Sequence, residues 1–393
     1  MPIPLLIAVV CALLSAAGTV YFALVIWAAM RFQRDRPRDV DQAFTPPVSI
    51  LKSLKGLDPQ MYEAFRSHCA LDYPEYEVLF GVHDMKEPAL ELVKKLQAEF
   101  PQRQLRVVHC PQELGLNGKV STLAQMLPQA QYEHIIINDS DIVVEWDYLR
   151  RVLAPFASPE IGMVTMLYRA LPGKTLGSRL EALGISTDFA GGVLVARELE
   201  GNIRFGLGAT IATTKTILRQ IGGLEPLAGY LGDDYEIGAR IAAAGHKVEL
   251  SDAVVETALP NYSLRDFWQH QLRWARNIKD RRPAQYFGLI VTFGLPWAIL
   301  AVMFWLSWWS CLALAAAVIA RFASAIIVGR GVLEDDYVGR DLWLVPIRDF
   351  VALAVWIASF MGNTVVWRGL RFKLRKGKLE KIKPQRRRDT EDS

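Results

Sequence analysis

Apolar residues gather in long charge-free blocks towards both ends of the chain and in short runs through its middle. Residues 4–30 contain no charged side chain, and such a run is long enough to cross a bilayer as a helix. A cleaved signal peptide is the alternative, but no basic residue precedes the run and the run is long for a signal sequence. The pattern therefore predicts a transmembrane anchor over residues 1–31 and a charged, proline-containing linker over residues 32–47.

Between these blocks, short β-branched runs alternate with segments of helical periodicity. Strands are predicted at residues 48–54, 77–82, 105–109 and 134–138, with helices between them at 59–69, 89–100 and 118–127. Further along, the pattern predicts a short strand at 210–213 and helices at 215–221, 233–244 and 264–279. Such alternation is typical of βαβ units, in which helices cover both faces of a mostly parallel sheet. One α/β domain is therefore expected over residues 48–282.

A second apolar block, residues 286–329, is too long for one crossing and suits a helical hairpin that turns near residues 307–310. A third apolar stretch, residues 342–366, carries the adjacent charges Arg348 and Asp349. Charges at that depth must face protein, water or lipid headgroups. A structural ion pair near the membrane interface is therefore predicted for these two residues.

The distribution of charged residues predicts on which side of the membrane the α/β domain lies. Four arginines follow the anchor within residues 31–38, so the positive-inside rule places the α/β domain in the cytoplasm. Membrane segments are expected over residues 283–367, followed by a basic tail over residues 368–393 that holds eleven Lys or Arg and one acid up to Arg388. The tail is expected to bind anionic lipid headgroups rather than nucleic acid. The anchor and a hairpin return the chain to the cytoplasm, so a further complete crossing by residues 342–366 would put this tail outside, against the same rule, and the sequence leaves that conflict open.

Two acidic residues directly follow the strand predicted at residues 134–138. The sequence there is HIIINDSDIVV, in which Asp139 and Asp141 follow three isoleucines. In open α/β sheets, ligands bind beyond the carboxyl ends of the strands. Two carboxylates at positions i and i+2 can hold a divalent cation such as Mg²⁺ or Mn²⁺, which can bridge to a diphosphate. This pattern favours a site that binds a nucleotide-sugar through a metal ion, and the alternative is a turn with solvated acids.

A second acidic pair, Asp233 and Asp234, opens a predicted helix. The helix dipole favours carboxylates in a first turn, so simple capping is the alternative to a chemical role. The next predicted helix carries three further candidates, His270, Arg273 and Trp274. The four cysteines of the chain lack metal-ligand spacing, and a reducing compartment argues against disulfides.

Six motifs occur in one order along the chain: PPVSILKSLKGLD (46–58), LDYPEYEVLFGVHD (71–84), LGLNGKVSTL (114–123), NDSDI (138–142), GYLGDDYEIGARI (229–241) and HQLRWAR (270–276). Together they resemble the ceramide glucosyltransferase-like family of inverting glycosyltransferases, and most closely its bacterial hopanoid-biosynthesis branch. The resemblance covers nearly the whole chain, including the first apolar block. It implies a GT-A nucleotide-binding domain anchored in a bacterial inner membrane, which transfers a sugar from a UDP-sugar to a lipid hydroxyl.

For the donor, the resemblance implies that Asp84 contacts the uridine and that Lys119 lies near the diphosphate or the base. It further implies that Asp141, assisted by Asp139, holds the divalent metal. These residue types suit the chemistry because the leaving diphosphate gains charge, which a metal can stabilise. The alternatives are a surface turn residue for Asp84 and a solvated lysine at a helix start for Lys119.

For the transfer step, the resemblance implies that Asp234 is the general base and that Arg273 and Trp274 close over the diphosphate and sugar. Inversion is a single displacement, in which a carboxylate within about 2.6–3.2 Å takes the proton of the attacking hydroxyl. The planar fork of arginine suits phosphate oxygens, and the flat face of tryptophan suits a sugar ring. The alternatives are Asp233 as the base, and an ion pair with a core aromatic for Arg273 and Trp274.

One sugar, N-acetylglucosamine or glucose, is therefore expected to move to a hopanoid polyol, with ceramide glucosylation as the alternative. A processive polysaccharide synthase is disfavoured because such enzymes carry glutamine where His270 stands and need a larger membrane bundle. A catalytically silent scaffold is disfavoured because every expected acid is present. The mixed apolar and charged segment 176–200 is expected at the membrane interface beside the acceptor entrance, or else as an ordinary core helix and loop.

Overall fold

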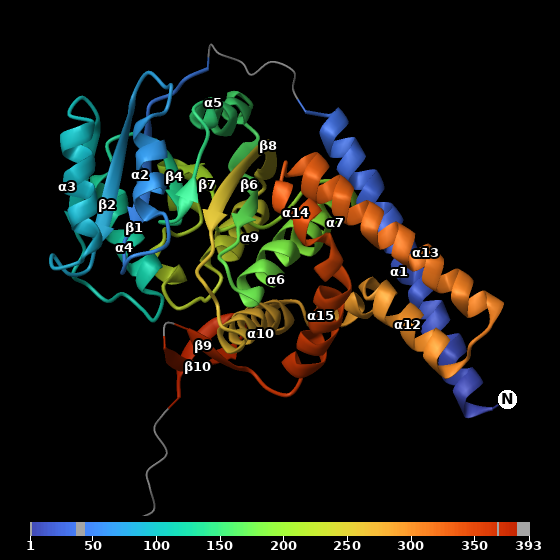
Figure 1. Ribbon diagram of the computed structural model, residues 1–393. Coiled ribbons are helices and arrows are strands. Elements are labelled where there is room, and N and C mark those ends of the chain that lie inside the picture. Colours follow the sequence, from blue (N-terminus) through green and yellow to red (C-terminus); the bar gives the residue numbers. More distant parts are fainter. Residues whose placement is uncertain (1, 37–43, 368, 383–393) are drawn as a thin grey trace, which may run out of the picture.

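The computed structural model describes residues 2–36, 44–367 and 369–382, and its α/β domain is built on an eight-stranded mixed sheet. The strands are β1 (Val48–Ser53), β2 (Tyr76–Val82), β3 (Gln104–His109), β4 (His134–Asn138), β5 (Ile142–Val143), β6 (Ile161–Leu171), β7 (Ile211–Thr214) and β8 (Lys247–Ala258). They follow the order β3-β2-β1-β4-β7-β6-β8-β5 (Figure 1). The run from β3 to β4 is parallel, as the alternating pattern predicts, whereas β7 is antiparallel to both of its neighbours.

The isoleucine run of β4 is buried on both faces of the sheet. Ile135 and Ile137 belong to one hydrophobic core and Ile136 to the opposite one, because successive side chains of a strand alternate between faces. One core is covered by α4 (Gly118–Met126), α8 (Lys215–Gln220) and α9 (Asp233–Ala243), and the other by α2 (Met61–Cys69), α3 (Ala89–Glu99) and α5 (Tyr148–Leu153). An uninterrupted apolar strand requires this two-sided cover.

The sequence pattern does not predict β6 and β8, which pair in parallel along most of their length. Charged residues interrupt the apolar alternation of β8. In the structure two of these charges are paired with arginines, since Asp252 meets Arg151 at 2.9 Å and Glu256 meets Arg169 at 3.0 Å. Tertiary ion pairing therefore lets polar residues lie in a strand that periodicity alone does not reveal.

Three helical stretches are long and apolar enough to cross a membrane, namely Ile3–Arg34 (α1), Trp308–Val332 and Asp336–Ser359. A fourth candidate is the pair Pro283–Thr292 and Gly294–Phe304, which is bent by 55° at its break. The bent pair is either a broken span or a re-entrant loop, so the described residues contain three or four candidate spans.

The apolar helices pack closely against one another. α12 (Gly294–Phe304) and α13 (Trp308–Ile326) contact each other and α1. The turn between them ends at Ser307, whose side chain caps α13, so the predicted turn is confirmed, while two membrane crossings by its arms stay a prediction. A Cβ on Gly18 of α1 would lie 2.4 Å from the Cα of Gly294. Only small residues permit two helices to approach this closely.

The segment expected at the membrane interface is one long helix that contains a π-helical turn. It comprises α6 (Leu176–Gly184), the π-helix Ile185–Phe189 and α7 (Ala190–Leu199). α7 lies against α1, where a Cβ on Gly191 would be 3.0 Å from Cγ1 of Val25. Figure 1 shows α6 and α7 between the sheet and the apolar helices. The segment is therefore placed beside the candidate membrane spans, and the acceptor entrance stays a prediction.

The ion pair predicted between Arg348 and Asp349 of α15 (Val345–Ser359) takes a different form. Adjacent residues on a helix do not face each other, so each charge finds its partner on another element. Asp349 pairs with Arg321 of α13 at 2.8 Å, and Arg348 lies 3.5 Å from Asp188 in the π-helix. These charges face the protein interior rather than one another.

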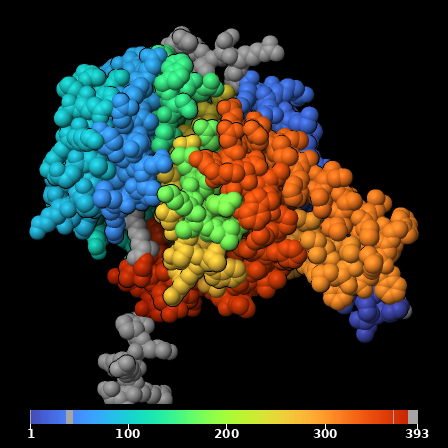
Figure 2. Space-filling model, viewed as in Figure 1, coloured from blue at the N-terminus to red at the C-terminus, as the bar shows by residue number. Residues whose placement is uncertain are grey.

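The beginning of the expected basic tail belongs to a three-stranded antiparallel sheet. Its strands are β9 (Thr364–Trp367), β10 (Leu370–Arg375) and β11 (Lys378–Lys381), in the order β11-β10-β9. Leu374 and Leu379 are buried, while the alternating Lys373 and Arg375 are exposed. The sheet lies under α10 (Leu264–Arg281), and Figure 2 shows its red surface continuous with that of the yellow helix. Residues 383–393 of the tail lie outside the described residues.

Candidate active site

Two aspartates follow β4 at the carboxyl edge of the sheet. Asp139 is half-buried, and its Oδ1 accepts a hydrogen bond from Lys119 Nζ at 2.6 Å. Asp141 Oδ2 accepts a hydrogen bond from Thr257 Oγ1 at 2.5 Å. Burial, together with the neighbouring Asp139 carboxylate, raises the pKa of Asp141 to about 6. These partners distinguish the pair from a turn whose acids face only water.

The second acidic pair lies at the start of α9 and reaches the same edge. Asp233 is buried, and its Oδ1 accepts a hydrogen bond from Asn117 Nδ2 at 3.2 Å. Its Oδ2 lies 3.6 Å from Lys119 Nζ. Although burial opposes the charge, Asp139 and Asp233 raise the pKa of Lys119. Lys119 therefore links two acidic motifs that are far apart in the sequence.

Asp234 faces Asp139 across a glycine. Its Oδ2 lies 3.2 Å from the position that a Cβ on Gly208 would occupy, and Asp139 Oδ2 lies 3.5 Å from the same position. Any side chain at residue 208 would enter the space between the two carboxylates. Burial and the adjacent Asp233 raise the pKa of Asp234 to about 6. A carboxylate with this pKa is ionised at neutral pH and is more basic than an ordinary aspartate, which suits a general base.

Lys52, at the end of β1, is a site residue that sequence reasoning missed. Its side chain is fully buried, and Nζ donates a hydrogen bond to the main-chain oxygen of Asp139 at 3.1 Å. Burial lowers the pKa of Lys52 to about 7. A lysine inside an otherwise apolar strand is rarely buried without a partner. That signal was present in the strand sequence VSILKS.

The residues present fit a divalent cation that binds together with a diphosphate. Four aspartates gather around only two lysines, so negative charge is in excess. Across the part of the chain that the structure describes, no group of three or more His, Cys, Asp or Glu side chains is arranged to hold a metal ion. Mg²⁺ is usually held by one or two carboxylates and completed by substrate phosphates. Asp139 and Asp141 supply two such carboxylates and leave the remaining coordination positions to the substrate phosphates and water.

Asp84 follows β2, two strands away from β4 at the same edge of the sheet. Its side chain is exposed, and Oδ1 accepts a hydrogen bond from the main-chain N–H of Lys86 at 2.9 Å. This contact is local to a turn and agrees with the alternative of a surface turn residue. The predicted contact with uridine stays a prediction.

Trp274, on α10, forms part of an aromatic wall beside the carboxylates. Its ring centroid lies 5.2 Å from that of His270 and 6.0 Å from that of Phe189. Phe189 in turn packs on Tyr168 at 5.3 Å. Burial and the carboxylate of Asp234 raise the pKa of Tyr168, which places this end of the wall near the acids. The preceding residue on α10, Arg273, is partly buried.

The C-terminal sheet is attached to the loop that leads into the second acidic pair. The N–H of Leu231 donates to the carbonyl of Gly377 at 3.1 Å, and the N–H of Leu379 donates to that of Gly229 at 2.8 Å. Arg281 of α10 donates to the carboxylate of Glu236 in α9. The start of α9 is thus held from outside the main domain, a role that the basic composition of the tail did not indicate.

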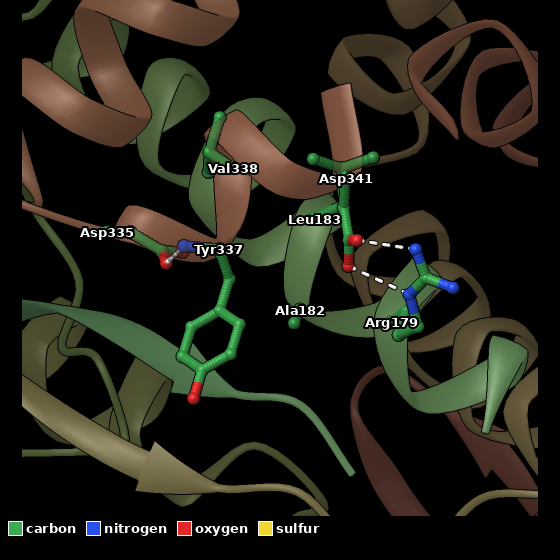
Figure 3. Close-up of a pocket in the computed structure, with 7 residues that line it drawn as sticks. All are labelled: Arg179, Ala182, Leu183, Asp335, Tyr337, Val338 and Asp341. Atoms are coloured by element: carbon green, nitrogen blue, oxygen red, sulfur yellow. Dashed lines mark hydrogen bonds and ion pairs between the residues drawn. The ribbon is translucent and has the colours of Figure 1, made fainter. Parts of the chain in front are cut away.

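A separate small pocket lies between α6 and α14 (Asp336–Asp341), as Figure 3 shows. Arg179 of α6 makes a forked ion pair with Asp341, with distances of 3.0 and 2.5 Å. Both charges have their partner, so this pocket is a packed joint between two helices. Its lining residues are Arg179, Ala182, Leu183, Asp335, Tyr337, Val338 and Asp341.

The mixed α/β sheet with acids at its carboxyl edge has the GT-A architecture that the resemblance implied, and apolar helices at both ends of the chain are candidate membrane spans. Residues 10–380 match the family model described as Glycosyl transferase family 21. The chain therefore belongs to that family, and the predicted family and enzyme class are confirmed.

Similar proteins agree with this assignment. Ceramide glucosyltransferase 1 of Caenorhabditis elegans is 23% identical over 84% of this chain and 72% of its own length. A beta-monoglucosyldiacylglycerol synthase of Synechocystis is 23% identical over 71% of this chain and 60% of its own length. Among solved structures, a mannosyltransferase from Pyrobaculum calidifontis in complex with GDP-mannose and Mn²⁺ matches with a TM-score of 0.55 and 20% identity, covering 90% of this chain and 98% of its own. This last similarity shows the fold.

Proposed function

We propose that this glycosyltransferase moves one sugar from a UDP-sugar to the hydroxyl of a membrane lipid, with inversion at the anomeric carbon. The observation that carries the proposal is the convergence of Asp139, Asp233 and Asp234 around Lys119, next to helices that also pack on α1. The arrangement joins an acidic donor site to apolar helices in one protein. The arginines after α1 favour a catalytic domain on the cytoplasmic side of a bacterial inner membrane.

For the donor, Asp139 and Asp141 would hold Mg²⁺ or Mn²⁺, which when bound offsets the charge that develops on the leaving diphosphate. The mannosyltransferase that shares this fold was solved with GDP-mannose and Mn²⁺, which supports this choice. Lys119 and Arg273 supply positive charge for the diphosphate. Asp84, on the edge of the sheet that holds the acids, is proposed to bind the uridine.

For the transfer, Asp234 takes the proton of the acceptor hydroxyl as that oxygen attacks the sugar. Its raised pKa, about 6, makes it a stronger base than an ordinary aspartate while leaving it ionised at neutral pH. Trp274 presents an aromatic face on which the apolar side of a sugar ring can pack. The aromatic wall excludes water from this region, which favours the lipid hydroxyl over water as the acceptor.

For the acceptor, a hopanoid polyol receiving N-acetylglucosamine or glucose is the first proposal. Ceramide with glucose is the alternative, and the nematode relative supports it. The exposed basic face of the C-terminal sheet, formed by Arg371, Lys373 and Arg375, is proposed to lie against anionic lipid headgroups. A processive synthase differs from all of these because its product is a polymer.

The test is a matrix of purified protein, UDP-sugars and lipid acceptors, with Mg²⁺, Mn²⁺ or a chelator, and mass spectrometry of the products. A lipid heavier by one sugar residue supports the proposal, and a ladder of heavier products supports a processive synthase. Absence of any lipid product across a panel that includes hopanoid polyols, ceramide and diacylglycerols contradicts it.

A further inference from the structure

A second group of buried charges lies between the α6–π–α7 helix and the apolar helices. We call it the inter-helix cluster, and it consists of Asp188, Arg321, Arg348 and Asp349. Arg321 Nε donates to both carboxylate oxygens of Asp349 at 3.0 Å, and its Nη2 donates to Asp188 Oδ1 at 2.6 Å. Arg321 is 0% exposed and Arg348 is 7% exposed. Ionisable groups between candidate membrane helices are retained mainly for function.

The cluster leaves hydrogen-bond donors without acceptors. Nη1 of Arg321, and both Nε and Nη1 of Arg348, have no hydrogen-bond partner among the residues that the structure describes, and one acceptor of the cluster, Oδ2 of Asp188, has none either. Buried polar groups are almost always hydrogen-bonded, because an unpaired one loses its hydration without compensation. Three unpartnered donor nitrogens and one unpartnered carboxylate oxygen in one cluster therefore indicate that polar groups of another molecule complete it, and a hydroxyl, which both donates and accepts, fits this set.

One face of each of the two guanidinium groups is covered by another part of the protein. Arg321 lies over the ring of Phe22 in α1, with its Cζ 5.2 Å from the ring centroid. Arg348 lies on Gly184, where a Cβ would come within 2.4 Å of its Nε. Stacking of this kind covers the faces of a guanidinium and leaves its in-plane N–H groups to bind acceptors.

Charge balance limits what the missing partner is. The cluster contains two arginines and two aspartates, so its formal charge is zero. A phosphate or a cation would leave one buried charge uncompensated, which is strongly unfavourable. An uncharged oxygen acceptor, such as a hydroxyl or an amide carbonyl, would satisfy the donors at no such cost.

The position of the cluster connects it to the transfer site. Asp188 is followed by Phe189, which packs on Trp274 in the aromatic wall. Arg348 Nη2 also donates to Gln271 of α10 at 3.0 Å. The side chain of Asp188 is 32% exposed, so the cluster has access to the surface. The π-helical turn that carries both residues is itself a feature frequent at functional sites.

We propose that the inter-helix cluster binds the non-reacting polar groups of the acceptor lipid, and that it selects a neutral lipid with more than one oxygen function. The proposal rests on the lipid transfer proposed above. Arg348 supplies N–H donors to a second hydroxyl or a carbonyl of the lipid, while a first hydroxyl reacts near Asp234. A lipid with a single hydroxyl and no other polar group would leave those donors unpaired.

The test compares a hexadecyl vicinal diol with hexadecanol as acceptors for the full-length protein. The wild type is expected to prefer the diol in kcat/KM. Arg348→Lys keeps the positive charge but removes the fork, so we expect it to lower kcat/KM for the diol roughly ten- to a hundredfold while hexadecanol and donor binding change little. Arg179→Lys is the matched control, because it disturbs another arginine–aspartate pair, between Arg179 and Asp341, that is satisfied within the protein, and it should leave the preference unchanged.

Several outcomes would overturn this inference. Equal losses for both acceptors in Arg348→Lys, or no loss for either, would show that the cluster only holds the helices together or binds water. If Arg348→Lys is not recovered as a folded protein that binds the donor, Arg348→Gln, which also removes the forked guanidinium but keeps an amide donor, provides the same comparison, with the same loss of preference expected. Transfer by the wild type to neither acceptor, nor to any lipid of the wider panel, would instead contradict the proposed function.

Discussion

The protein contains two buried clusters of charged side chains that differ in their charge balance. At the sheet edge, Asp139, Asp141, Asp233 and Asp234 outnumber Lys52 and Lys119. Between the helices, two arginines meet two aspartates. The first cluster is therefore suited to a cation and a charged donor, and the second to an uncharged acceptor. The same residue types thus take on different tasks according to whether their charges cancel.

The largest difference is expected from Asp234→Asn at the sheet edge. Removing the proposed base should lower the rate of transfer about 100- to 10,000-fold, because the hydroxyl loses its proton acceptor. Donor binding, measured by calorimetry, should persist. Stability should not fall, since the change removes repulsion between Asp234 and Asp233. Full activity of this variant, with Asp336→Asn as the control because the Asp336 side chain is 90% exposed, would show that the base is elsewhere.

A substitution in the inter-helix cluster should instead lower the free energy of unfolding. Asp349→Asn removes the carboxylate that accepts the Arg321 fork and leaves a buried cation poorly compensated, at a cost of about 3 kcal/mol. Thermal unfolding in detergent measures this effect. Asp336→Asn is the control, because its pair with Arg330 is exposed and contributes little. Equal unfolding temperatures for the two variants would remove the distinction between the clusters.

Removal of the divalent cation should lower transfer through its effect on the acidic cluster alone. Chelation is expected to reduce transfer about 100-fold or more, because the leaving diphosphate loses its charge partner. Asp141→Asn should produce a similar loss and weaken donor binding. Activity should return on adding Mg²⁺ or Mn²⁺ to the wild type. Undiminished transfer in the presence of a chelator would contradict the metal assignment.

The acidic limb of the pH profile tests the environment of Asp234. Burial and Asp233 raise its pKa to about 6, while Lys119 opposes the shift and Asp139 adds to it. The active form is ionised, so kcat/KM should fall about tenfold for each pH unit below 6. Asp233→Asn removes one raising charge and should move this limb to lower pH. A limb that stays in place in this variant would assign the titration to another group.

The smallest effect is expected at the C-terminal sheet, which holds the loop before the acidic pair. Gly377 and Gly369 both have positive φ, but only at Gly377 would a Cβ meet a side chain, 2.7 Å from Arg281 Cζ. Gly377→Ala and Gly369→Ala should each cost about 1 kcal/mol in backbone strain. Only Gly377→Ala should also lower kcat several-fold, by displacing Arg281 from Glu236. Equal kcat values would show that the sheet does not position the acids.

Much of the fold was predictable because it follows from local periodicity. The β-branched run before Asp139 had to be a strand, and its burial on both faces follows from its uninterrupted apolar side chains. Ser307 and its neighbours marked the turn of the apolar hairpin. Strand β8 was not predictable in the same way, because its charges are stabilised by arginines from distant elements.

The sequence by itself determined the family, the apolar helices and the identity of the acids, because motif order and periodicity are local properties of a chain. Only the tertiary structure decided which charges meet. It brought Lys119 between Asp139 and Asp233, placed Lys52 under the loop, and separated Arg348 from Asp349. The physical reason is that electrostatic energy depends on distance and burial, and both are set by chain segments that are remote from one another in the sequence.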